Sequence, residues 1–213
     1  MQFNKQILAT AVGATLLGLG CSAHATNGDQ MLGVTATQWG MAGAVTAAPQ
    51  DAATMMYNPA GVAELGIEDV RFDMGFGLLN PPRKANGVES DSNWYMMPTG
   101  AAVFKVNDKL FLGMGLGGIS GMGVNVPDIL LAPGSQPMVT TKQVFRFSPA
   151  AAYKVNDALT LGASLNIVNQ SLAMSMPVPN PASPPPTIQV NLPQNQQFGF
   201  GATLGATYKI NPN

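Results

Sequence analysis

The sequence predicts an all-β protein, an antiparallel transmembrane β-barrel preceded by an export signal. Three observations favour this class: few charged side chains, many glycines, and long stretches in which apolar residues alternate with small or polar ones. Charged residues make up 10% of the chain, whereas soluble domains average about 25%. Mean hydropathy is only +0.14, and no apolar run reaches the ~20 residues that a membrane-spanning helix needs. This composition fits strands with one apolar and one polar face.

An export signal opens the chain. A positive charge and a short apolar run precede residues 23–25 (Ala-His-Ala), which have the small-x-small pattern of a cleavage site. Residues 1–25 are therefore predicted to be a secretory signal peptide that is removed after export. Cys21 leaves a lipoprotein as an alternative, although Gly18 stands where a lipobox usually has leucine.

Cleavage would remove both the sole cysteine, Cys21, and the sole histidine, His24. Without a thiol or an imidazole, triad catalysis and the usual zinc sites are excluded. Carboxylate pairs remain as a catalytic option, but the acidic residues show no paired spacing beyond Asp69 and Asp73. We therefore expect no enzyme, no metal site and no cofactor. The net charge of −1 provides no basic field that would attract nucleic acid.

A repeat places the tight turns. Residues 101–116 (AAVFKVNDKLFLGMGL) match residues 150–165 (AAAYKVNDALTLGASL), and residues 205–213 (GATYKINPN) repeat the first half. Asn-Asp and Asn-Pro accept the backbone angles of tight turns, so each copy predicts a strand, a turn and the next strand. An aromatic residue and a lysine precede each turn, which we interpret as an aromatic ring with snorkelling lysines at one barrel rim. Because the third copy ends at its turn, we expect the chain to be the N-terminal part of a longer barrel.

Six long stretches carry the alternating pattern. In the first, the apolar residues at even positions from Val70 to Leu78 oppose charged residues and glycines. Short turns alternate with long connections, and the long connections are expected outside the cell. Six strands are too few to close a transmembrane barrel, so the alternative to a longer chain is assembly of several chains. The predicted strands are residues 67–79, 93–106, 109–120, 143–156, 158–172 and 195–210, and the predicted long connections are 80–92, 121–142 and 173–194.

Residues 26–66 precede the first strand and fit no strand pattern. Asn58 followed by Pro59 predicts a helix N-cap with proline at the first helical position, so a short helix should run to about residue 65. We expect residues 26–66 to form a hatch inside the barrel and residues 67–213 to form a partial barrel wall. The alternative for the first segment is a disordered periplasmic tail.

These features resemble the FadL family of outer-membrane transporters, which includes channels for long-chain fatty acids and for aromatic hydrocarbons. The resemblance covers the mature chain and rests on YNPAG at 57–61, the F/Y-K-V-N-D turns and the glycine-rich third strand at 110–123. It implies a barrel of about fourteen strands around an N-terminal hatch, of which this chain supplies the hatch and the first six strands. It also implies a bacterial outer-membrane location, a hydrophobic small-molecule ligand, contact with outer-membrane lipid and a monomeric full-length protein.

The resemblance further implies transport by capture, hatch movement and lateral release into the bilayer. Asn58, Pro59 and Ala60 match the family signature and are expected to govern hatch movement. Arg146 is expected to face the lumen, either as a contact for a fatty-acid carboxylate or paired to an acidic neighbour. The lateral opening is expected at a kink in the third strand, with close packing as the alternative role for its glycines. The glycines assigned to the kink are Gly113, Gly115, Gly117, Gly118 and Gly121.

Two other functions remain open from the sequence. A general porin would need a charged constriction, for which the chain has few charges. A structural or adhesive barrel would need loops that dominate its surface. The sequence does not choose between fatty acid and hydrocarbon as the ligand.

Overall fold

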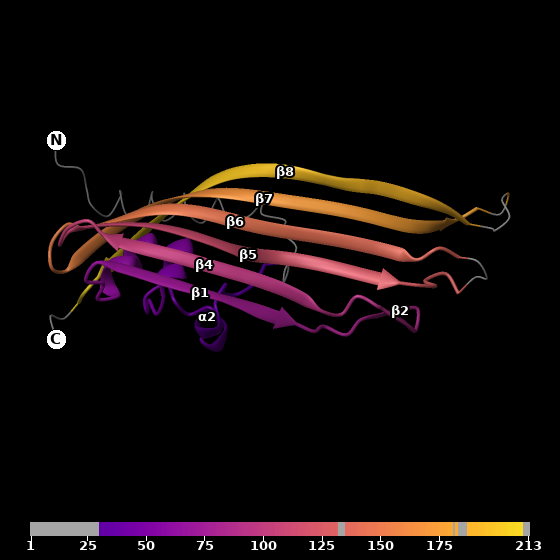
Figure 1. The fold of residues 1–213 in the computed structure, drawn as a ribbon, viewed down its shortest axis with the longest axis horizontal. Coiled ribbons are helices and arrows are strands. Elements are labelled where there is room, and N and C mark those ends of the chain that lie inside the picture. The colour runs from indigo at the N-terminus through magenta and orange to yellow at the C-terminus, as the bar shows by residue number, and fades with distance from the viewer. Residues whose placement is uncertain (1–29, 132–134, 181, 183–186, 211–213) are drawn as a thin grey trace, which may run out of the picture.

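The computed structural model describes residues 30–131, 135–180, 182 and 187–210. The predicted signal peptide, with Cys21 and His24, lies outside the described residues. Six strands form one antiparallel sheet in which each strand pairs with the next along the chain (Figure 1). The strands are β1 (Val70–Leu79), β4 (Tyr95–Lys105), β5 (Leu110–Val126), β6 (Met138–Lys154), β7 (Leu159–Pro179) and β8 (Thr187–Tyr208), and β2 (Lys84–Ala85) with β3 (Val88–Glu89) forms a separate small hairpin.

The predicted fold class is confirmed. The sheet is antiparallel and open between β1 and β8, and short helices from residues 30–66 lie against one of its faces (Figure 1). We call this face the inner face and residues 30–66 the hatch. Among the described residues, no helix combines the length and apolar character needed to cross a membrane.

Both tight turns of the repeat have the same hydrogen bonds. The Asn107 side-chain oxygen accepts from the backbone N–H groups of Lys109 and Leu110, each at 2.9 Å. The Asn156 oxygen accepts from the two equivalent groups at 2.9 and 2.8 Å. The repeated asparagine therefore forms each turn by holding the backbone of the next strand.

The last four strands are longer than predicted, so much of the predicted connections at 121–142 and 173–194 is strand instead. Their residues break the apolar alternation, because only the part of a strand that contacts lipid needs an apolar outer face. Backbone pairing between neighbouring strands continues beyond the apolar alternation, as in the ladder from Met174↔Leu192 to Pro179↔Thr187. Pairing with β6 stops at Ser175, so Pro177 leaves no hydrogen bond unmade on that side.

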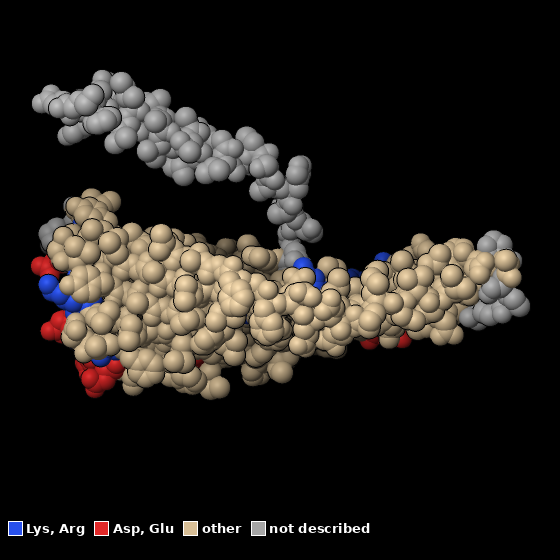
Figure 2. All heavy atoms as spheres, turned by 90° about the horizontal axis from the view of Figure 1, so that it is seen from above, with Lys and Arg blue, Asp and Glu red and all other residues tan. Residues whose placement is uncertain are grey.

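The outer face of the sheet is apolar and exposed, as the alternation predicted. Phe72 and Met74 of β1 are 63% and 77% exposed, while Val103 of β4 is fully buried on the inner face. Charged side chains gather at the end of the molecule that carries the tight turns, and most of the remaining surface in view is uncharged (Figure 2).

The lysines of the repeat do not snorkel along the outer face, which corrects the prediction. Adjacent residues of a strand point to opposite faces, so an exposed aromatic residue is followed by a lysine on the other side. Lys209 lies 2.8 Å from Glu64 of the hatch, and the Lys154 ammonium lies 5.2 Å from the centroid of the Phe111 ring. Lys105 pairs with Asp108 of the turn at 2.8 Å.

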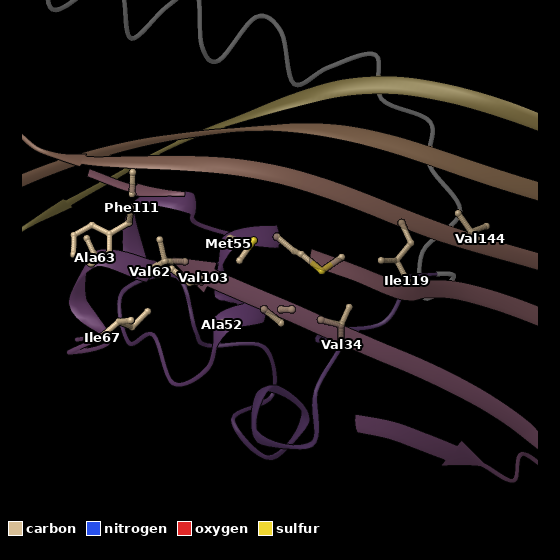
Figure 3. Close-up of a cluster of buried hydrophobic side chains, with 14 residues drawn as sticks. Val34, Ala52, Met55, Val62, Ala63, Ile67, Val103, Phe111, Ile119 and Val144 are labelled. Atoms are coloured by element: carbon tan, nitrogen blue, oxygen red, sulfur yellow. The ribbon is translucent and has the colours of Figure 1, made fainter. Parts of the chain in front are cut away.

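The main hydrophobic core lies between the hatch and the wall rather than within the sheet. Figure 3 shows Val34, Met55 and Val62 of the hatch in one cluster with Val103, Phe111 and Ile119 of the wall. The hatch is thus the surface that buries the inner face of these strands.

Candidate functional site

The hatch contains three short helices, and a buried polar network joins the first of them to the start of the second. They are α2 (Ala36–Gly40), the 3₁₀ helix η1 (Ala52–Met56) and the 3₁₀ helix η2 (Pro59–Glu64). The Asp51 carboxylate accepts from the Thr35 hydroxyl at 2.6 Å and from the Gln38 amide at 2.9 Å. Thr35 in turn caps α2 by accepting from the Gln38 N–H. Satisfied buried polar groups of this kind favour one arrangement of the helices.

Charged residues of β1 tie the wall to the start of η1. Asp73 accepts from the Ala52 N–H at 2.8 Å and from the Arg71 guanidinium at 2.7 Å. Arg71 also donates to the Gln50 carbonyl at 2.9 Å. These charges therefore position the hatch from one side.

Asn58 joins the hatch to the opposite side of the sheet. Its amide group donates to the carbonyls of Thr46, at 2.7 Å, and Ala206 of β8, at 3.2 Å. Its side-chain oxygen accepts from the Ala60 N–H at 3.2 Å, so it is the N-cap of η2 with Pro59 at the first position. The predicted cap is present, although the helix is 3₁₀ rather than α. Asn58 is only 3% exposed.

Arg146 lies on the inner face of β6 and contacts the hatch. Its guanidinium donates to the Met56 carbonyl at 2.9 Å and lies 5.5 Å from the centroid of the Tyr57 ring. Within the part of the chain that the structure describes, its contacts are hatch groups rather than a carboxylate, and its Nε is buried without a partner. Arg146 is therefore a further connection between wall and hatch.

The predicted kink glycines divide into two groups. Gly113 and Gly115 pair with both β4 and β6, so they lie in a closed part of the wall. A Cβ on Gly113 would lie 2.6 Å from Cε of Met55, and one on Gly115 would lie 3.0 Å from Cγ of Met56. The structure thus gives these two glycines the packing role.

Gly117 and Gly118 lie where the wall changes its pairing. The β4–β5 ladder ends at Thr99↔Gly117, although β4 pairs with β1 as far as Tyr95 and β5 pairs with β6 as far as Val126. The β5–β6 register shifts between Gly118 and Ser120. Just beyond the end of the β4–β5 ladder, β5 is paired by the hatch. Further along, the Tyr95 hydroxyl donates to the Gly123 carbonyl at 2.7 Å and the Asp91 N–H donates to the Asn125 carbonyl at 2.8 Å.

The hatch contact with β5 is made by backbone groups. Met31 donates its N–H to the Ile119 carbonyl at 2.8 Å, and Gln30 forms an antiparallel bridge with Ser120. The Thr99 hydroxyl donates to the Val34 carbonyl. The start of the described hatch therefore lies directly beside the point where β4 and β5 separate.

A cavity of about 360 Å³ occupies this gap between β4 and β5. Its volume falls within the range of small-molecule sites, about 300–1,000 Å³. Gly118 and Gly121 contribute to its wall, and the Arg83 guanidinium lies over the Tyr95 ring at 5.2 Å. Gly118 and Gly121 were expected at the kink, whereas most of the other residues around the cavity come from separate strands and from the loop after β1, which no local sequence pattern brings together. Its other lining side chains include Leu79, Met96, Met97, Met122, Lys142 and Phe145.

Apolar side chains line the cavity together with the polar Ser120 and Gln143 and the cationic Arg83 and Lys142, so it suits a largely hydrophobic molecule with a polar group. Among the described residues, no group of three or more histidine, cysteine or acidic side chains could hold a metal ion.

Solved structures with a similar fold support this architecture. The Pseudomonas putida toluene transporter TodX matches with a TM-score of 0.62 and 21% identity, over 76% of this chain and 48% of that chain. A TodX mutant described as a monoaromatic hydrocarbon channel gives 0.61 at the same identity and coverage. A Pseudomonas aeruginosa FadL homologue gives 0.51 and 19% identity, over 78% of this chain and 46% of that chain.

At these identities the likeness shows the fold, and this chain spans about half the length of the matched structures. No curated protein matches the sequence significantly. The family model described as "Outer membrane protein transport protein (OMPP1/FadL/TodX)" matches residues 18–213. The chain therefore belongs to the OMPP1/FadL/TodX family of outer membrane transport proteins.

Proposed function

We propose that the chain forms the hatch and the N-terminal wall of a transporter that carries hydrophobic small molecules across the bacterial outer membrane. A ligand is captured, the hatch moves, and the ligand leaves sideways into the bilayer between β4 and β5. One observation carries the proposal: the β4–β5 ladder ends at Thr99↔Gly117, and a cavity lined by apolar and cationic side chains lies beyond it.

A lateral exit suits an apolar ligand. Leaving an apolar environment for a water-filled lumen costs about 0.8 kcal/mol for each buried CH₂ group. A ligand that passes through the gap between β4 and β5 avoids most of this cost. The gap has its own cost, because backbone groups without partners are strongly unfavourable in lipid. The Met31 N–H of the hatch donates to the Ile119 carbonyl and so satisfies one such group of β5. Because this bond depends on where the hatch lies, it supports a link between the position of the hatch and the opening of the wall.

The hydrogen bonds between the hatch and the wall are points at which a ligand could release the hatch. Asn58, Pro59 and Ala60 hold it against β7 and β8, while Arg146 holds the carbonyl of Met56. A ligand carboxylate that reached Arg146 would compete with that carbonyl and loosen the hatch. In this proposal Arg146 is both a hatch contact and the point at which an anionic ligand acts.

The ligand class has two candidates. TodX is named a toluene transporter, which suggests aromatic hydrocarbons. The guanidinium of Arg83 at the cavity favours an anionic head group, as on a long-chain fatty acid. Direct uptake measurements distinguish the two.

The test is uptake of radiolabelled oleate and, in parallel, of radiolabelled toluene by an outer-membrane transporter-null strain. The strain expresses the whole gene in wild-type form, with Asn58→Ala, or with Asn166→Ala as a control. Among the described residues, the Asn166 side chain bonds to Ser148 and Thr203 of the wall. We expect uptake of one substrate, reduced by Asn58→Ala and unchanged by Asn166→Ala. Folded protein in the membrane without uptake of either substrate would contradict the proposal and favour a structural barrel.

A further inference from the structure

Two wall glycines face each other where the hatch meets β7 and β8. Gly162 and Gly205 are direct partners in the β7–β8 ladder, and both face the Asn58-Pro59-Ala60 turn. We infer that this pair forms a notch that seats the turn, and that Gly162 and Gly205 are positioning residues for the closed hatch. The inference rests on the proposed function, since it assigns the seat of the hatch on which that function depends.

Gly162 contacts the hatch backbone itself. A Cβ at this position would overlap the Ala60 nitrogen and would lie 2.6 Å from the Pro59 carbonyl carbon and 2.8 Å from the Ala60 Cα. Carbon atoms in contact prefer about 3.5–4.0 Å. Because a backbone cannot rotate away as a side chain can, any larger residue at 162 must displace the turn by roughly 1 Å.

Gly205 contacts the part of Asn58 that caps η2. A Cβ there would overlap the Asn58 side-chain oxygen and would lie 2.9 Å from Cδ of Pro59. That oxygen accepts from the Ala60 N–H, and the amide nitrogen of the same side chain donates to the carbonyl of Ala206. A methyl group at 205 would therefore force Asn58 out of the position in which its hydrogen bonds are made.

The neighbouring glycines of β8 do not approach the hatch in this way. A Cβ on Gly201 would lie 3.9 Å from its nearest neighbour, Cβ of Asn166, which is an ordinary contact. Gly199 is similarly open, with its nearest neighbour at 4.0 Å. Glycine at 205 is thus required by the hatch and not by the strand.

An ion pair fixes the other end of the same helix. Glu64, the last residue of η2, lies 2.8 Å from Lys209 and accepts from the Thr160 hydroxyl at 3.3 Å. Helix η2 is therefore held at its start by the glycine notch and at its end by charge. This ion pair is a native reporter of hatch position, because it forms only while η2 lies against β7 and β8.

Carbodiimide joins a carboxylate to an amine only when the two groups touch, so it can report this ion pair. The whole gene is expressed with Gly162→Ala, with Gly205→Ala or with Gly201→Ala as the matched control. Outer membranes are treated with carbodiimide, and the Glu64–Lys209 cross-link is quantified by mass spectrometry of the joined peptides. Heat-modifiable electrophoretic mobility reports folding of the barrel in each variant.

We expect Gly162→Ala to lose most of the cross-link and Gly205→Ala to lose part of it, with barrel folding retained and Gly201→Ala unchanged. If Gly162→Ala fails to fold, Gly205→Ala carries the test, since it displaces a side chain rather than a backbone. Wild-type cross-linking in every folded notch variant would overturn the inference. The readout is independent of transport: cross-link loss in a protein that takes up neither oleate nor toluene would support the notch while refuting the proposed function.

Discussion

Replacing Asn58 by alanine should loosen the hatch and weaken its attachment to the wall. The change removes three hydrogen bonds: to the Thr46 and Ala206 carbonyls and from the Ala60 N–H. A typical hydrogen bond contributes about 1 kcal/mol net, and losing an N-cap costs about 1 kcal/mol. Because Asn58 is buried, water cannot easily replace its amide as the hydrogen-bond donor to the Thr46 and Ala206 carbonyls. Of the three bonds, only the one to Ala206 joins the hatch to the wall, whereas the Thr46 and Ala60 bonds lie within the hatch. The hatch should therefore lose about 2–3 kcal/mol against local opening, of which about 1 kcal/mol is its attachment to the wall. The total is roughly a 30- to 150-fold change in its opening equilibrium.

Hydrogen exchange followed by mass spectrometry measures this opening directly. Peptides covering residues 46–66 of the purified protein should exchange faster in Asn58→Ala by about the same factor, if exchange follows opening. Asn58→Ser keeps a capping oxygen but loses the amide donor, so its exchange should be intermediate. Asn166→Ala, which removes bonds within the wall, should leave these peptides at the wild-type rate. Hatch exchange in Asn58→Ala within about twofold of wild type would refute the assignment of these bonds as the anchor.

Two further substitutions test how the wall holds the hatch. Gly113→Ala should destabilise the protein by about 1–3 kcal/mol in denaturant unfolding, because the added methyl group overlaps Met55. Met55→Ala in the same chain should make the added methyl group nearly harmless. If the free-energy changes of the two substitutions simply add in the double mutant, the contact between residues 113 and 55 is contradicted. Arg146→Met should accelerate exchange of the hatch around Met56, since it removes the bond to that carbonyl. If Arg146→Met changes oleate uptake without changing hatch exchange, Arg146 acts on the ligand alone.

Local features of the sequence predicted the local features of the fold. The Asn-Asp turns, the outer apolar face and the N-cap at Asn58 each depend on residues within a few positions of one another, and each is present. The ends of the strands could not be located in this way. Where a strand leaves the lipid, its side chains no longer alternate, and only pairing with a neighbour keeps it extended.

Contacts between the hatch and the wall could not be predicted, because they join residues far apart in the chain. Asn58 and Ala206 are 148 positions apart. Glycine in a strand indicates a bulge or a close approach, but the sequence does not say which. Gly113 packs against Met55, whereas Gly118 lies beside a register shift. Only the arrangement in space distinguishes these two roles.

A reversible cross-link across the gap between β4 and β5 tests whether ligand leaves through it. Met97 and Gly118 face each other there, since a Cβ on Gly118 would lie 3.0 Å from Cε of Met97. Met97→Cys with Gly118→Cys can be joined by a short thiol-specific linker. The control pair, Ala102→Cys with Met114→Cys, joins register partners where the wall is already closed.

Uptake of the transported substrate is then measured before cross-linking, after it, and after reduction of the linker. We predict that the link between positions 97 and 118 abolishes uptake, that reduction restores it, and that the control link has no effect. Undiminished uptake with a complete link across the gap would contradict lateral exit at this position.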